Sequence, residues 1–181
     1  MWPRHTYLYA AALTAAIALS SGCQPEIGDA CQRSTDCSRT GERVCDLSNR
    51  VRGRGECILE GCGRGDCPDE AACVKIYGSK FLSVACNPQR EDRATFGPDG
   101  ETLPPEDNCM PNEVCLAEGL CADEVTARTS CRRKCSDNGD CRSGYECTRT
   151  GAGGIYRAPN LDNPTNRKET KICTPRADEA E

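Results

Sequence analysis

Residues 135–147 read CSDNGDCRSGYEC, in which three cysteines are separated by two gaps of five residues. This rhythm returns along the chain, so that sixteen cysteines fall into four groups with a first gap of four or five residues, a second of five to seven and a longer third. The spacing predicts tandem cysteine-rich modules. The four groups are Cys31, Cys37, Cys45 and Cys57; Cys62, Cys67, Cys73 and Cys86; Cys109, Cys115, Cys121 and Cys131; and Cys135, Cys141, Cys147 and Cys173.

The text around the second cysteine of each group also recurs. An aspartate stands directly before it in three groups, as Asp36, Asp66 and Asp140, and the third group has the poorer copy Asn112-Glu113-Val114-Cys115. A short carboxylate at this place is typical of a turn, because it can accept hydrogen bonds from nearby backbone amides. We therefore expect a capped turn ahead of each second cysteine.

Composition limits what else the chain can use to fold. It has 181 residues, 17 cysteines and 4% aromatic residues, and only 20 of the 159 residues from Cys23 onward are Leu, Ile, Val or Phe. Such a chain buries too little apolar surface to offset its conformational entropy, whereas disulfides can do so by restricting the unfolded state. We expect a small disulfide-rich fold, mostly loops with short β-hairpins, a few helical turns and little hydrophobic core, made in an oxidising compartment.

The first 22 residues have the features of an export signal. Arg4 and His5 precede a 13-residue apolar run, residues 7–19, and the small residues Ser20, Ser21 and Gly22 follow. Thirteen residues are too few for a membrane-spanning helix, which needs about 20. Without this segment the side-chain charge of the chain is −6, from 22 cationic and 28 acidic residues.

Residues 19–23 read LSSGC and resemble the lipobox of bacterial lipoproteins, in which the cysteine becomes the mature N-terminus. The resemblance implies lipidation of Cys23, with acyl chains anchoring the protein to a membrane of the cell envelope. Removing Cys23 from the count leaves an even sixteen cysteines, which can all pair. Gln24 is similar to the sorting signal for the outer membrane. The alternative is cleavage by the general signal peptidase after Ala18.

Residues 140–147, DCRSGYEC, match a unit that is repeated in cysteine-rich lipoproteins of large-genome Gram-negative bacteria, and the spacing more distantly resembles Dickkopf-type cysteine modules. The resemblance implies an extracytoplasmic module and brings no active site with it. Small interlocked modules usually close with first-to-third and second-to-fourth disulfides, and we expect this pairing within each group.

These patterns predict a domain order. We expect a signal peptide at 1–22, a tether at 23–30, two modules at 31–86, a linker rich in proline and charge at 87–108, two modules at 109–173 and an acidic tail at 174–181. The linker is expected to separate two halves. Residues 74–77 and 80–85 are expected to form a hairpin around Gly78-Ser79, with Ile76 facing Phe81. Helical turns are expected within residues 68–72 and 122–134.

The residues for catalysis or metal binding are missing. From Cys23 onward the sequence has no histidine and no Cys-x2-Cys pair, which disfavours a zinc site, a thioredoxin-like site and a histidine-dependent nucleophile. Only Cys131 and Cys135 come close, at Cys-x3-Cys. Acidic pairs such as Asp137 with Asp140, or Asp99 with Glu101, do not fit a calcium loop and are expected to be solvated turns. The sequence therefore predicts a protein with no catalytic residues, metal or cofactor.

A tripeptide motif and two basic clusters have simple interpretations that involve no function. Arg64-Gly65-Asp66 spells an integrin-type tripeptide in a short loop, although about 0.12 such tripeptides are expected at random from the composition. Basic clusters at residues 50–54 and 132–134 could meet anionic headgroups or polysaccharide, but solvated faces are the simpler interpretation. The negative net charge and few aromatics argue against nucleic-acid binding.

Together these features predict a non-enzymatic, lipid-anchored envelope protein, exported by the secretory pathway, whose modules recognise or adhere to an extracellular macromolecule. Two alternatives remain open at this point. The protein could be a structural envelope or stalk component, or it could inhibit an extracellular protease by presenting Arg64.

Overall fold

The computed structural model describes residues 24–78, 84–151, 153–158 and 169–179. Over these residues the chain forms short strands, two single-turn 3₁₀ helices and many turns, and it forms no α-helix. The predicted disulfide-rich fold with short hairpins and a few helical turns is confirmed. The elements are β1 (Ala30–Cys31), η1 (Ser34–Asp36), β2 (Val44–Val51), β3 (Arg54–Glu60), β4 (Ala71–Ile76), β5 (Thr95–Phe96), β6 (Thr102–Leu103), β7 (Glu113–Cys115), β8 (Cys121–Asp123), β9 (Arg128–Arg133), η2 (Asn138–Asp140), β10 (Tyr145–Arg149), β11 (Ile155–Arg157) and β12 (Lys171–Pro175).

The largest sheet joins strands from distant parts of the chain. Its order is β1-β3-β9-β4-β11, with β2 also paired to β3. Three two-stranded sheets complete the fold, formed by β10 with β12, β7 with β8 and β5 with β6. Because β9 lies between β3 and β4, residues from both sides of 87–108 share one sheet. The two halves are therefore not separate, and 87–108 is not a plain linker, since it contains the β5–β6 hairpin.

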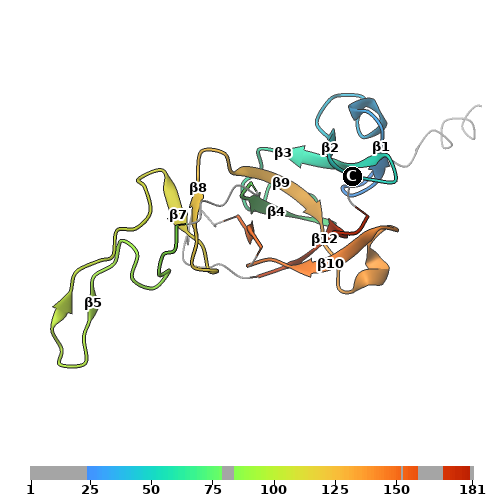
Figure 1. The fold of residues 1–181 in the computed structure, drawn as a ribbon. Helices are drawn as coiled ribbons and strands as arrows, with labels where there is room; N and C mark the ends of the chain where they lie inside the picture. The colour runs from blue at the N-terminus through green and yellow to red at the C-terminus, as the bar shows by residue number, and fades with distance from the viewer. Residues whose placement is uncertain (1–23, 79–83, 152, 159–168, 180–181) are drawn as a thin grey trace, which may run out of the picture.

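The molecule is elongated. Figure 1 shows the main sheet with β10 and β12 at one end, β7 and β8 beyond the end of β4 and β9, and β5 at the far end. The strands β1, β2 and β3 lie at the end opposite β5. The first residues of the described chain and the β5–β6 hairpin are thus at opposite ends of the molecule.

The disulfides reveal that one module is inserted inside another. The expected first-to-third and second-to-fourth pairing holds in full in the first and fourth groups. In the second and third groups only the first-to-third bonds, Cys62–Cys73 and Cys109–Cys121, form as expected. Cys67 pairs with Cys131, and Cys86 pairs with Cys115. If Cys86 and Cys131 exchange groups, the pairing rule holds throughout. The four units are then Cys31, Cys37, Cys45 and Cys57; Cys62, Cys67, Cys73 and Cys131; Cys86, Cys109, Cys115 and Cys121; and Cys135, Cys141, Cys147 and Cys173.

All four units have the same internal geometry. The third and fourth cysteines face each other on antiparallel strands in every unit, as Cys73 faces Cys131 across β4 and β9. The first-to-third bonds have Cα–Cα distances of 5.8 to 5.9 Å, and the second-to-fourth bonds have distances of 5.4 to 5.6 Å. The third unit is therefore a complete copy, placed between the third and fourth cysteines of the second.

The predicted capped turns are present. Asp36, Asp66 and Asp140 each accept a hydrogen bond from the backbone N–H of the residue after the first cysteine, at 2.9, 2.6 and 2.6 Å. The hydrogen bonds from the amides of Gln32 and Ser136 hold the pKa values of Asp36 and Asp140 below the ordinary range. This network rigidifies the start of three units.

The supposed fourth copy of this turn has a different place in its unit. Glu113 caps the N–H of Met110 at 2.9 Å, but Met110 follows a second cysteine, Cys109, and not a first one. The five residues 110–114 instead correspond to the five residues that follow Cys67 and the five that follow Cys141. In each of these units the segment forms a turn between the second and third cysteines. The turn hydrogen bonds are Ala71 N–H to Pro68 C=O at 2.9 Å, Glu113 to Met110 at 2.8 Å and Tyr145 to Arg142 at 3.0 Å.

Two local expectations are wrong. Residues 74–76 do form a strand, but β4 is paired with β9 on one edge and with β11 on the other. The predicted partner strand, residues 80–85, therefore has no free edge of β4 to pair with. Ala85 bridges to Leu120 instead, and residues 79–83, with Phe81, lie outside the described residues. Residues 128–133 form strand β9 where a helical turn was expected, and residues 68–71 form a single turn before β4.

The apolar core is divided into small clusters, as the composition predicts. Ile27 packs with Cys62, Cys73 and Cys131 on one side of the main sheet, while Ile172 of β12 packs on Ala72 and Val74 on the other side. Most of the fully buried side chains are half-cystines. Since no cluster is large, the disulfides and strand pairings must hold the units in place.

A substitution at Gly55 tests the close contact between the backbones of β2 and β3. A Cβ built on Gly55 would lie 2.2 Å from the carbonyl oxygen of Asp46, at the start of the bulge in β2. We expect Gly55→Ala to lower the free energy of unfolding by about 1–3 kcal/mol, because the backbone must shift. Thermal unfolding of the oxidised protein measures the effect. Gly78→Ala is the control, since its Cβ meets nothing within 4 Å among the described residues; equal stabilities of the two variants would contradict the prediction.

Candidate recognition surface

The inserted unit forms an arm, defined as residues 84–127, that extends from the rest of the molecule, the body (Figure 1). Five large apolar side chains of the described residues are exposed, and four of them are in the arm. Phe96 is 79% exposed, Val125 78% and Met110 64%. These side chains are spread along the arm, with Phe96 on β5 and Val125 just after β8. The arm is therefore the main candidate for a recognition surface.

The arm is attached to the body by a joint around two tyrosines. Tyr77 follows β4 and Tyr156 lies on β11, and their rings meet edge to face with centroids 5.9 Å apart. Leu116 and Ala122 of the arm pack against Tyr77. Since β11 belongs to the long loop of the fourth unit, that loop helps to fix the arm.

Polar contacts complete the joint. Glu118 accepts a hydrogen bond from the Tyr156 hydroxyl, which in turn accepts one from the Ala117 N–H at 3.1 Å. Burial acts to raise the pKa of Glu118, but the hydrogen bonds from Tyr156 and the backbone outweigh it and hold this pKa below its ordinary value. Glu124 pairs with Lys75 and accepts a hydrogen bond from the Tyr77 hydroxyl at 2.8 Å. Both carboxylates therefore connect the arm to the body.

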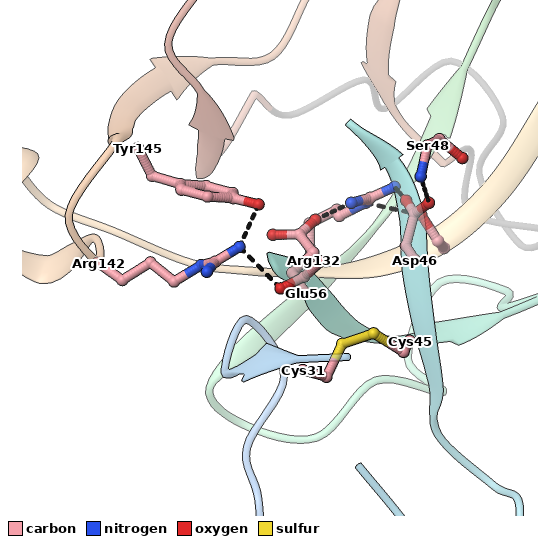
Figure 2. Close-up of polar contacts among 10 residues, drawn as sticks. Cys31, Cys45, Asp46, Ser48, Glu56, Arg132, Arg142 and Tyr145 are labelled. Carbon is pink, nitrogen blue, oxygen red and sulfur yellow. Dashed lines mark hydrogen bonds and ion pairs between the residues drawn. A yellow bond between two sulfur atoms is a disulfide. The ribbon is translucent and has the colours of Figure 1, made fainter. Parts of the chain in front are cut away.

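A second polar cluster joins the units of the body. Arg132 of β9 forms ion pairs with Asp46 of β2, at 2.6 Å, and with Glu56 of β3 (Figure 2). Only 13% of the Arg132 side chain and 5% of the Glu56 side chain are exposed. Burial acts to raise the pKa of Asp46, yet the hydrogen bonds from Ser48 and the charge of Arg132 leave it below its ordinary value. A buried arginine thus holds two carboxylates of the first unit.

Arg142 links the fourth unit to the same place. Its guanidinium donates to the Gly55 carbonyl at 2.9 Å and to the Tyr145 hydroxyl, and lies over the Tyr145 ring at 4.0 Å. Burial raises the pKa of Tyr145, so this hydroxyl stays neutral. Tyr145 is only 2% exposed and packs against Val51 of β2. Both arginines therefore connect units of the body through these contacts.

A groove of about 800 Å³ crosses the main sheet beside this cluster. Ile58 and Ile76 contribute apolar surface, Ser130 and Thr126 contribute hydroxyls, and Arg128 contributes an exposed positive charge. Asp46, Ser48 and Arg132 of the ion cluster also line the groove. The groove can accept a polar chain, but nothing in it selects one class of ligand.

The Arg64-Gly65-Asp66 loop has the form of a tight turn, in which Gly65 and Asp66 are exposed. The Asp66 carboxylate accepts a hydrogen bond from the Gly63 N–H, and the Asp66 N–H donates to the Gly63 carbonyl at 3.2 Å. Arg64 is half-buried, and disulfides fix both ends of the loop. A protease inhibitor presents an extended loop, so this geometry does not favour that alternative.

The two basic clusters of the sequence have different surroundings. Arg50, Arg52 and Arg54 are exposed on the β2–β3 hairpin, where Arg52 pairs with Glu179 at 3.1 Å. In residues 132–134, by contrast, Arg132 is buried in the ion cluster and Arg133 pairs with Glu26. Adjacent side chains of a strand point to opposite faces, so the second cluster is not one patch.

The acidic pairs also have separate roles. Asp140 caps the turn ahead of Cys141, and Asp137 caps the amide of Gly139 at 2.7 Å. Asp99 and Glu101 are exposed at the turn of the β5–β6 hairpin.

All sixteen cysteines of the described residues form disulfides. Several sets of three sulfur atoms lie within 4.8 Å of one another, among them those of Cys31, Cys37 and Cys45, but each atom belongs to a disulfide. A disulfide sulfur is not a thiolate and does not act as a metal ligand. Cys131 and Cys135 belong to different units, bonded to Cys67 and Cys147. These groups are therefore structural pairs.

The expected anchor lies outside the described residues. Residues 1–22 and the predicted lipidation site Cys23 are in that part of the chain, and the first described residue is Gln24. Among the described residues, no helix has the length and apolarity needed to cross a bilayer. The lipidation of Cys23 accordingly stays a prediction.

The chain matches no protein-family model, no curated protein and no solved structure. Its function is therefore inferred from its own residues. The arm was not foreseen as a recognition surface, although residues 84–127 carry a visible signal, with two arginines against ten acidic residues. Sequence reasoning missed this charge because it ends the second group at Cys86, which divides the acidic residues between a linker and the third group.

The buried ion cluster predicts a strong and specific mutational effect. We expect Arg132→Ala to lower the free energy of unfolding by about 3–5 kcal/mol, because two carboxylates lose their partner in a buried place. Arg149→Ala is the control and should cost at most about 1 kcal/mol, since the Arg149–Glu169 pair is exposed. Chemical denaturation of the oxidised proteins gives both values.

The same cluster predicts a dependence on pH. The pKa of Asp46 is lowered on folding, so its contribution is complete above its ordinary value of 3.8 and is lost as the pH falls through the lower folded value. Wild type should lose stability more steeply than Arg132→Ala below about pH 4. Parallel stability profiles for the two proteins would contradict this role.

The joint predicts a local effect. Tyr156→Phe keeps the ring contact with Tyr77 but removes both hydrogen bonds of the hydroxyl, which should weaken the joint by about 1.5–3 kcal/mol because one partner is charged. Hydrogen exchange should become faster in residues 114–127 while the exchange of β2 and β3 stays unchanged. Tyr156→Ala should give a larger effect of the same kind; unchanged exchange in both variants would disprove the joint.

Proposed function

We propose that this chain is a non-enzymatic, lipid-anchored protein of the bacterial cell envelope, exposed on the outer membrane, whose disulfide-stapled units recognise or adhere to another macromolecule. The observation that carries the proposal is the placement of the two ends. Strand β1 begins seven residues after Cys23, a stretch that spans at most about 25 Å, and the arm lies at the opposite end of the molecule. A chain anchored at Cys23 would present the arm away from its membrane.

The chemistry of the molecule supports the same proposal. Eight disulfides are typical of an exported protein, and they hold the units rigidly without a large core. Rigid surfaces lose little entropy on binding, which favours recognition by display. The exposed Phe96, Met110 and Val125 give such a display an apolar contact.

The anchor is tested by intact mass. The protein is expressed with its own signal in a Gram-negative host, extracted from membranes and alkylated without reductant. We expect the mass of residues 23–181 plus a diacylglycerol and an acyl chain, with no alkylation. Cys23→Ser is the control and should leave the membrane fraction. A mass without lipid, with the chain starting after Ala18, would overturn the anchor.

Recognition is tested by oriented display. Beads that carry residues 23–181 through the Cys23 thiol are incubated with cells of the source organism, and beads that carry the reduced and alkylated chain are the control. Saturable binding by the oxidised protein alone is the expected result. Equal binding by both kinds of bead, or none by either, would favour the structural envelope or stalk alternative over recognition.

A further inference from the structure

The charges of this chain are strongly divided between its two ends. The arm contains two arginines and ten acidic residues, a net side-chain charge of −8. The rest of the mature chain, residues 24–83 and 128–181, contains 20 cationic and 18 acidic residues, a net charge of +2. Such a difference between two parts of one elongated molecule favours contacts between unlike ends of neighbouring molecules.

The tip of the arm combines negative charge with an apolar side chain. Phe96 of β5 is 79% exposed, and Asp99 and Glu101 are exposed at the turn that follows. Among the described residues, neither carboxylate has an ion-pair partner. This tip is the part of the molecule farthest from β1 (Figure 1).

The opposite end carries matching features on the β2–β3 hairpin. Arg50 and Arg54 are exposed and have no ion-pair partner within the described part of the chain, and Leu47 is 37% exposed beside them. In the described sheet β2 pairs with no strand other than β3. The hairpin thus offers cations and an apolar side chain at the edge of the sheet.

We propose that the arm tip of one copy binds the β2–β3 hairpin of a second copy. The chain itself supplies both complementary surfaces, and an antiparallel pair makes the contact twice, which closes the pair with twofold symmetry. The proposal rests on the proposed function, because copies anchored in one membrane hold their tips away from each other's hairpins. The contact therefore joins copies on facing membranes and makes the adhesion homophilic.

A single contact of this kind is weak. Two short hairpins bury less than the roughly 800 Å² per partner of a standard interface, so many copies must act together. At about 0.15 M salt, charges interact over about 8 Å, so the opposed ends decide the interaction and the overall charge of −6 has little effect. Display on a surface is therefore the appropriate assay.

The experiment uses phosphatidylcholine vesicles that carry residues 23–181, coupled through the Cys23 thiol to a maleimide lipid. We expect these vesicles to aggregate at about 0.15 M salt, measured by light scattering, and to disperse at about 1 M salt. The tip variant D99K/E101K and the hairpin variant R50E/R54E should each aggregate at least about tenfold more slowly, because like charges then face each other. The body variant D69K/E146K is the matched control and should aggregate as wild type does.

Mixing the two variants is the decisive part of the test. Vesicles of the tip variant mixed with vesicles of the hairpin variant restore both contacts, one with the wild-type charges and one with the charges reversed, so aggregation should return. Wild-type vesicles that do not aggregate, or a mixture that stays dispersed, would overturn the proposal. If the beads of the preceding experiment still bind cells in that case, the proposed function stands and its partner is a different molecule.

Discussion

The Cys67–Cys131 disulfide is the constraint on which the arrangement of this molecule depends. It spans 64 residues and joins β9 to the segment just before β4. Cys73 and Cys131 therefore face each other on neighbouring strands. The chain that leaves on β4 must therefore return on β9, close to where it started. Everything between these strands is forced into an excursion with adjacent ends, and the arm is that excursion.

The joint and the ion cluster then determine how the parts sit. Tyr77 and Tyr156 hold the arm against the body, while Arg132 connects β9 to two carboxylates of the first unit. Each of these contacts is small, and each links elements that the disulfides have already brought together. The disulfides lower the entropic cost of making such contacts, which allows a chain with few large apolar residues to hold a defined shape.

Sequence reasoning predicted the local chemistry and missed the long-range pairing. The first-to-third and second-to-fourth rule and the aspartate caps are local, and they hold in the structure. The grouping is wrong because Cys86 and Cys131 both follow a third gap of variable length, and spacing alone cannot choose between them. For the same reason, β4 was recognised as a strand but its partners were not. Arg132 was predicted in an exposed cluster, since its carboxylate partners are more than 70 residues away in sequence.

Within the described part of the chain, no disulfide joins two cysteines that are consecutive in the sequence; every bond passes over at least one other cysteine. A chain that is exported from its N-terminus and oxidised as it emerges first brings consecutive thiols together, and those bonds are all non-native. Correct pairing of such a chain then requires thiol–disulfide exchange, because Cys67 must stay available until Cys131 arrives 64 residues later. The nested unit, which ends at Cys121, can be completed before the unit that encloses it.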